Sequence, residues 1–209
     1  LVGISNQTNR TRDLTTSQIK NRRGSAFNQE TGVANKFTQF ITKELIPYID
    51  ENYPTTSFRT LIGHSYGGLF TVNMLINHPS FFKIYIAIDP SFWWDNQYIV
   101  KEIDKVNIGQ IENNYFYLSS ANKYENFSGA THIFELNRNS HDTFYSKLMS
   151  RGISYSSFFR ISCMIRSKYM TRSIASCLAC SNQSIVERSV RSIVVPYLFR
   201  PTLARSCIC

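Results

Sequence analysis

The stretch LIGHSYGGLF, residues 61–70, constrains the fold of this 209-residue chain more than any other feature. It places Ser65 at the centre of the pattern G-x-S-x-G, with an apolar run before it and helical spacing after it. Glycines are needed where the backbone turns so sharply that side chains would collide across the turn. We therefore predict that Ser65 lies at a tight turn from a strand, Phe58–Ile62, into a helix, Tyr66–Asn77.

The rest of the chain alternates between apolar strands and amphipathic helices. Further strands are predicted at residues 1–5, Ile84–Asp89, Asn114–Ser119 and Ser154–Phe159, and helices at Phe37–Ile49, within Pro90–Val106 and at His141–Ser150. Pro47 is expected to kink the first of these helices. Residues 6–32, rich in Asn, Thr and Arg, are predicted to form a long loop. Such alternation predicts an α/β fold with a mostly parallel sheet and helices on both faces.

The chain changes character near Arg160. Residues 1–159 carry 15 Lys+Arg and 13 Asp+Glu, a net charge of +2, whereas residues 160–209 carry 8 Lys+Arg and one acid, a net charge of +7. All five cysteines also lie after Arg160. We interpret residues 1–159 as a partial α/β domain. Residues 160–209 are interpreted as a basic tail rich in Cys, Ser and Arg, poorly structured and either disordered or translated from a non-native reading frame.

The beginning of the sequence leads to two further expectations. Residues 1–5 resemble the middle of a buried strand and begin with Leu1, so we expect the natural N-terminus to lie upstream. No charged and apolar targeting segment is visible, and the compartment stays open. No apolar run reaches 18 residues, so no membrane span is predicted.

Four motifs, in order, carry a family resemblance. The stretches ISNQTNRTRDLT, FITKELIPYIDENY, LIGHSYGGLF and YIAIDPSFWWD resemble the esterase D/enterochelin esterase-like branch of the α/β-hydrolases, which includes siderophore esterases. The resemblance extends from residue 1 to about residue 159. It implies a partial α/β-hydrolase fold with residues 1–5 as its fourth strand. It also implies a small-molecule ester substrate, hydrolysis through an acyl-enzyme on Ser65, and no metal or cofactor.

The motifs suggest roles for four residues. Two lie in the turn after the predicted strand Phe58–Ile62, and two follow the predicted strand Ile84–Asp89. Ser65 would be the nucleophile, because the helix that follows places free amides and the positive end of its dipole beside it. The backbone N–H of Tyr66 would stabilise an oxyanion. Trp93 and Trp94 follow another strand at the same sheet edge and are predicted to line an apolar substrate pocket. The alternative for these two residues is packing of the core.

The acid and base partners of Ser65 are less clear from the sequence. A serine hydroxyl needs a base to remove its proton, and in this fold the chain order is Ser, acid, His. Glu125 is the best-placed acid, although it could be an exposed loop carboxylate. The four histidines are His64, His78, His132 and His141. None follows the last predicted strand, so we predict that the general base is missing and that activity is impaired.

Two other functional classes stay open, and metal binding is not predicted. The chain could be a non-catalytic remnant whose basic tail binds polyanions through charge, although no motif indicates specific nucleic-acid binding. It could also be an acyltransferase, as in the related mycolyltransferases. Cys177-x-x-Cys180 and Cys207-x-Cys209 suggest zinc, but the second spacing is shorter than zinc sites use. The oligomeric state is not indicated.

Overall fold

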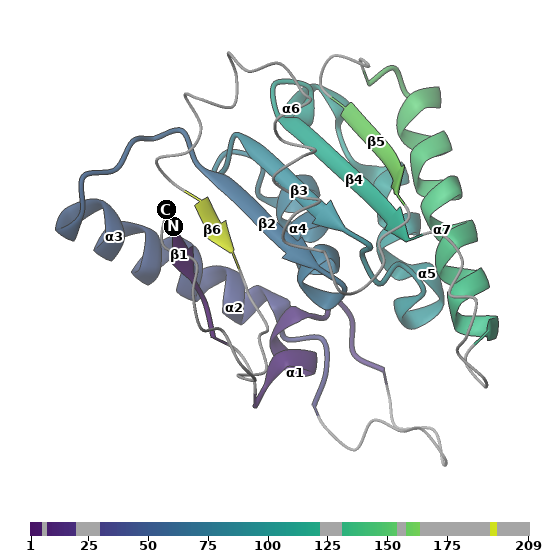
Figure 1. The fold of residues 1–209 in the computed structure, drawn as a ribbon, viewed down its shortest axis with the longest axis horizontal. Helices are drawn as coiled ribbons and strands as arrows, with labels where there is room; N and C mark the ends of the chain where they lie inside the picture. The colour runs from purple at the N-terminus through teal and green to yellow at the C-terminus, as the bar shows by residue number, and fades with distance from the viewer. Residues whose placement is uncertain (6–7, 20–29, 122–130, 154–157, 164–192, 196–209) are drawn as a thin grey trace, which may run out of the picture.

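One parallel sheet runs through the part of the chain that the computed structural model describes, which is residues 1–5, 8–19, 30–121, 131–153, 158–163 and 193–195 (Figure 1). Its six strands lie in the order β1-β6-β2-β3-β4-β5, and every neighbouring pair is parallel. The strands are β1 Val2–Gly3, β2 Thr60–His64, β3 Ile84–Ile88, β4 Tyr115–Ala121, β5 Phe158–Cys163 and β6 Ile193–Val195. Parallel neighbours bring β2, β3 and β4 to one common carboxyl edge.

Helices connect the strands and cover the sheet. They are α1 Arg10–Leu14, α2 Ala34–Phe40, the π-helix Ile41–Leu45, α3 Ile46–Asn52, α4 Tyr66–Asn77, α5 Trp94–Glu102, the 3-10 helix Ile103–Lys105, α6 Ile108–Ile111 and α7 Thr131–Ser150. Figure 1 shows α3 at the β1 side of the molecule and α7 along the β5 side. None of the described helices is both long enough and apolar enough to cross a bilayer.

The core is built around α4, whose predicted bounds, Tyr66–Asn77, are confirmed. Its residues from Gly67 to Ile76 are buried, and the helix packs against both β2 and β3. Those two strands are themselves buried over most of their length, as expected for parallel strands covered on both faces. The start of α4 is therefore held by close packing on several sides.

The segment predicted as a loop over residues 6–32 contains a short helix, so that prediction is wrong for Arg10–Leu14. The helix begins after Asn9, whose carbonyl accepts a hydrogen bond from the Asp13 amide at 2.9 Å. Leu14 is 3% exposed and anchors the helix in the core. One apolar residue in a polar stretch gives no helical periodicity, so the sequence pattern did not predict this helix. Tertiary packing of Leu14 stabilises it.

The helical region after Gly32 contains the predicted irregularity at Pro47. Pro47 lies in the first turn of α3 and has no N–H to donate to the turn before it. The preceding turn, Ile41–Leu45, is π-helical and joins α2 to α3. This junction lets Ile41 and Ile46 both face the core, with exposures of 0% and 8%.

Several other predicted bounds differ from the structure. The helix α7 begins ten residues before the predicted His141, because the polar stretch before that residue carries little apolar periodicity. The helix α6 was not predicted. The strand β5 runs through Phe159 and Arg160, and its residues up to Cys163 pair with β4. The strand β6 pairs with β1 and β2.

Two strands include residues beyond the predicted boundary at residue 160. Residues 160–163 and Ile193–Val195 pair in the sheet. Backbone pairing along a parallel ladder depends on extended geometry and not on net charge. The division of the chain into residues 1–159 and 160–209 stays a prediction. The remaining residues after 163, including the paired cysteines considered for zinc, lie outside the described residues.

The helix α5 contains a left-handed turn at its start. Asp95, Asn96 and Gln97 have φ angles of 44°, 52° and 64°. A side chain in this conformation costs roughly 1–2 kcal/mol per residue. Substituting Gln97→Gly should therefore stabilise the fold by about 0.5–1 kcal/mol, after the larger entropy of glycine in the unfolded chain is subtracted.

The matched control is Lys101→Gly, in the part of α5 without positive φ angles, where glycine should destabilise by about 0.5–1 kcal/mol. Urea unfolding of both variants measures the difference. Equal destabilisation by the two glycines would contradict the left-handed turn.

Candidate active site

The turn between β2 and α4 has the predicted geometry. The strand ends at His64, the helix begins at Tyr66, and Ser65 between them has φ 58° and ψ −118°. A non-glycine residue in such a sparsely populated region costs about 1–3 kcal/mol and persists only where the surroundings enforce it. The predicted sharp strand-to-helix turn at Ser65 is thus confirmed.

Close backbone approach explains Gly63 of the motif and Gly68 next to it. A Cβ atom on Gly63 would lie 2.1 Å from the carbonyl oxygen of Gly67, a distance that no packing can accommodate. A Cβ atom on Gly68 would lie 3.0 Å from Cα of Pro90. The second contact shows that the turn after β3 presses directly against the first turn of α4.

Ile88, the last residue of β3, and Ser91, three residues further on, hold Ser65 through three hydrogen bonds. The Ser65 amide donates to the carbonyl of Ile88 at 3.0 Å, and the Ser91 amide donates to the carbonyl of Ser65 at 3.1 Å. The hydroxyl oxygens of Ser65 and Ser91 are 3.2 Å apart. The sequence analysis did not single out Ser91. Its place after a strand neighbouring β2, at the same sheet edge, is the signal that could have identified it.

The amide of Tyr66 lies at the start of α4. Tyr66 is the first residue of α4, and the first amides of a helix have no acceptor within the helix. The positive end of the helix dipole adds to the field at this point. An oxygen that gains negative charge beside Ser65 could therefore accept a hydrogen bond here.

An aromatic cluster formed by Tyr66, Trp93 and Trp94 borders the turn. The Tyr66 ring centroid is 6.0 Å from Trp93 and 5.4 Å, edge-on, from Trp94. Trp93 is half-buried, whereas Trp94 is 1% exposed and donates its indole N–H to the Ser17 carbonyl at 3.2 Å. The prediction that Trp94 lines a pocket is therefore wrong, because the core and the Ser17 carbonyl enclose it. Trp93 keeps accessible surface.

Arg10 covers the Tyr66 ring from the other side of the cluster. Its guanidinium carbon lies 4.9 Å from the ring centroid, a cation–π contact. Its Nε atom is buried and has no hydrogen-bond partner among the described residues. Burial lowers the pKa of Arg10. Burial also raises the pKa of Tyr66 to about 12, an effect that Arg10 partly opposes. The site therefore carries a partly desolvated positive charge.

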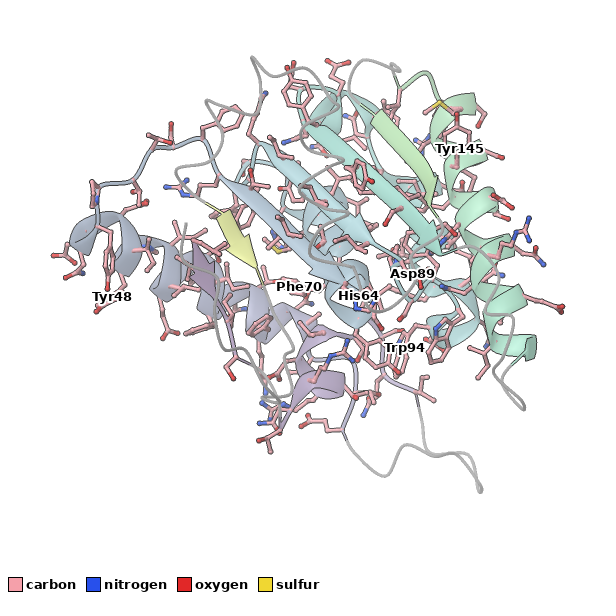
Figure 2. All side chains as sticks on the ribbon, in the orientation of Figure 1. Tyr48, His64, Phe70, Asp89, Trp94 and Tyr145 are labelled. Carbon is pink, nitrogen blue, oxygen red and sulfur yellow. The ribbon has the colours of Figure 1, made fainter. Side chains whose placement is uncertain are left out.

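The histidines occupy different environments, and none of those described bonds to Ser65. His64 is exposed at the carboxyl edge of the sheet, close to Asp89 and Trp94 in Figure 2. Desolvation lowers the pKa of His64; Asp89 opposes this shift, and Arg10 adds to it. His78 caps the end of α4, and its amide donates to the Met74 carbonyl at 2.9 Å.

His141 is fully buried in α7, and its imidazole is bonded at both nitrogens. Nδ1 lies 2.8 Å from Ser120 Oγ, and Nε2 lies 2.8 Å from the carbonyl oxygen of Pro90. Asp89 Oδ1 is 4.0 Å from Nδ1. Glu125, the predicted acid, lies outside the described residues, as does the side chain of His132.

Comparison with known proteins identifies the family of this chain. The esterase family model described as "Putative esterase" matches residues 1–134, which is more than half of the sequence. The chain belongs to this esterase family. The siderophore enterobactin esterase of Emericella nidulans is 43% identical over 82 residues, which are 38% of this chain and 27% of that protein. The ferri-bacillibactin esterase BesA of Bacillus subtilis is 41% identical over 76 residues, 36% of this chain and 26% of that protein.

Solved structures show the same fold. The siderophore hydrolase EstA from Aspergillus nidulans has a TM-score of 0.62 at 21% identity, covering 87% of this chain and 67% of that one. The BES protein from Bacillus cereus has a TM-score of 0.63 at 23% identity, covering 80% and 61%. The predicted α/β-hydrolase fold and its siderophore esterase-like branch are confirmed. The chain matches about a quarter of the length of these two curated relatives.

The turn of this esterase-family chain should not tolerate a side chain at Gly63. Gly63→Ala places a Cβ atom within 2.1 Å of the Gly67 carbonyl oxygen and should destabilise by more than about 3 kcal/mol. Gly3→Ala, in β1, meets nothing within 4 Å and should change stability by less than about 0.5 kcal/mol. Thermal unfolding of both variants tests the contrast, and similar melting temperatures would contradict the close approach.

Proposed function

We propose that this chain is a serine hydrolase that cleaves carboxylic esters through an acyl-enzyme on Ser65. The observation that carries the proposal is the strained conformation of Ser65, φ 58°, at the turn between β2 and α4. Such turns present a serine oxygen at the carboxyl edge of an α/β sheet. Membership of the esterase family supports the same reaction class.

The residues at this edge have distinct roles in the proposed reaction. Ser65 Oγ attacks the ester carbonyl, and the Tyr66 amide donates a hydrogen bond to the oxyanion that forms. Collapse of this intermediate releases the alcohol and leaves the acyl group on Ser65. Water then attacks the acyl-enzyme and releases the acid.

We propose that this chain, by itself, acylates slowly. A general base contributes typically 10²–10⁴-fold to such a step. Within the described residues, the hydrogen-bond partner of Ser65 Oγ is another hydroxyl, that of Ser91, which is a poor base. The sequence holds no histidine after His141, and the resemblance places the base after the last strand. Glu125 stays the proposed acid, and residues 1–159 the proposed esterase domain.

We further propose that the ester substrate carries an anionic group or a strong hydrogen-bond acceptor, as a siderophore would. Arg10 supports this proposal, because its buried Nε has no partner in the described structure and could donate to such a group. Trp93, half-buried beside Tyr66, offers an apolar surface for an aromatic or acyl part. Three of the curated relatives are named as esterases of siderophores or of ferri-bacillibactin, which agrees with this class.

A fluorophosphonate probe tests the nucleophile and the missing base together. Labelling should be slow, should increase when imidazole is added as an external base, and should be abolished in Ser65→Ala. Ser80→Ala, at an exposed serine after α4, is the control and should label like the unmodified chain. Mass spectrometry of the labelled peptide identifies the modified residue.

Two results would contradict separate parts of this proposal. Absence of labelling with and without imidazole would contradict the hydrolase. Rapid labelling that does not depend on imidazole would show that a base is present and would contradict the impairment alone.

The role of Arg10 is tested by binding of 2,3-dihydroxy-N-benzoyl-glycine, the compound present with the FES esterase of Shigella flexneri. Arg10→Gln should weaken binding by about 10- to 150-fold, because a charge-assisted hydrogen bond is worth about 1.5–3 kcal/mol. Arg12→Gln is the control, because Arg12 already bonds to Asp13 at 2.7 Å. Titration calorimetry gives both affinities, and equal losses for the two variants would contradict the role of Arg10.

A further inference from the structure

We propose that His141 is a positioning residue for Ser65, acting through the turn of residues 89–91. This inference rests on the proposed role of Ser65 as the nucleophile. His141 lies in α7 and does not contact Ser65, so its effect is transmitted by the backbone. The turn formed by Asp89, Pro90 and Ser91 is the link between them.

The contacts of His141 favour one tautomer of the neutral ring. A carbonyl oxygen can only accept a hydrogen bond, so the 2.8 Å contact with the Pro90 oxygen places the proton on Nε2. In the neutral ring Nδ1 is then an acceptor, and the Ser120 hydroxyl at 2.8 Å donates to it. The Phe92 ring meets the imidazole edge-on at 4.9 Å and holds its plane. The ring is therefore bonded at both nitrogens and packed against Phe92, with 0% exposure.

The turn that His141 holds is itself bonded at each residue. The Asp89 amide donates to the Ser119 carbonyl at 2.9 Å, the Pro90 carbonyl accepts from His141, and the Ser91 amide donates to the Ser65 carbonyl at 3.1 Å. Asp89 has φ 42°, a strained conformation for a non-glycine residue. A strained turn relaxes unless its neighbours hold it, and the bond from His141 acts at its centre.

Movement of this turn would reach the nucleophile directly. Ser91 contributes both its amide and its hydroxyl to Ser65, and Pro90 packs against the first turn of α4 at Gly68. The Pro90 carbonyl also accepts a hydrogen bond from the Phe92 amide at 2.8 Å. Loss of the bond from His141 would leave this carbonyl held only from within its own turn and would loosen the rotamer of the Ser65 hydroxyl. His141 thus connects α7 and β4 to the serine without touching it.

Amide hydrogen exchange in the full chain tests the connection without relying on activity. His141→Phe keeps a ring against Phe92 but removes both hydrogen bonds. It should raise the exchange rate of the Ser91 amide about tenfold relative to the amides of β3. His141→Gln, which keeps a donor near the Nε2 position, should restore slow exchange at Ser91. Leu148→Ala, at a buried α7 residue away from the turn, should not change that ratio.

Labelling rates provide a second readout, specific for action through Ser91. His141→Phe should slow phosphonylation of Ser65 in the unmodified chain but have little further effect in a Ser91→Ala background, because coupled residues are not additive. Equal slowing in both backgrounds would overturn the route through Ser91. If the unmodified chain is not labelled, the proposed hydrolase function is contradicted. The ratio of the Ser91 amide exchange rate to that of the β3 amides then still tests the role of His141.

A measurement on the unmodified chain covers the case in which the variants do not fold. Long-range proton–nitrogen correlation spectra report which ring nitrogen of a histidine carries the proton. We expect the Nε2–H tautomer for His141. The Nδ1–H tautomer, or an unchanged Ser91 exchange ratio in His141→Phe, would overturn the proposal.

Discussion

The close approach of the backbone at Gly63 and Gly67 is the constraint on which the rest of this structure depends. A turn this tight leaves no room for a side chain and forces Ser65 into a conformation that is unfavourable for a serine. The unfavourable energy of that conformation is offset by the packing of the buried helix α4 against β2 and β3. The strained residue Ser65 is therefore held in place by the packing of the elements around it.

Support for Ser65 comes largely from a neighbouring turn. Residues 89–91 follow β3 and bond to the backbone and the hydroxyl of Ser65, while His141 bonds to the same turn from α7. Parallel pairing of β2 with β3 places both turns at one edge of the sheet. The site is consequently assembled from segments more than 70 residues apart in sequence, and its precision depends on the packing of α7.

The sequence predicted the local elements that carry strong signals. The bounds of α4 and the positions of Ser65 and Tyr66 were predicted because glycine spacing and helical periodicity are local properties. The helix α1 was missed because Leu14 alone gives no period, and the start of α7 was missed because its first turns are polar. Trp94 was misassigned because a tryptophan in a motif looks the same whether it faces a ligand or the core.

The order of the residues was enough to predict a serine at a glycine-rich turn in an alternating α/β chain. These features depend on backbone sterics and on apolar periodicity, which act over a few neighbouring residues. The esterase type came from the resemblance of four motifs to a known family. The contacts of Ser91 with Ser65, of Arg10 with Tyr66 and of His141 with Pro90 became visible only in the folded molecule. Those contacts join distant parts of the chain, and their geometry follows from strand order and helix packing, which no local pattern encodes.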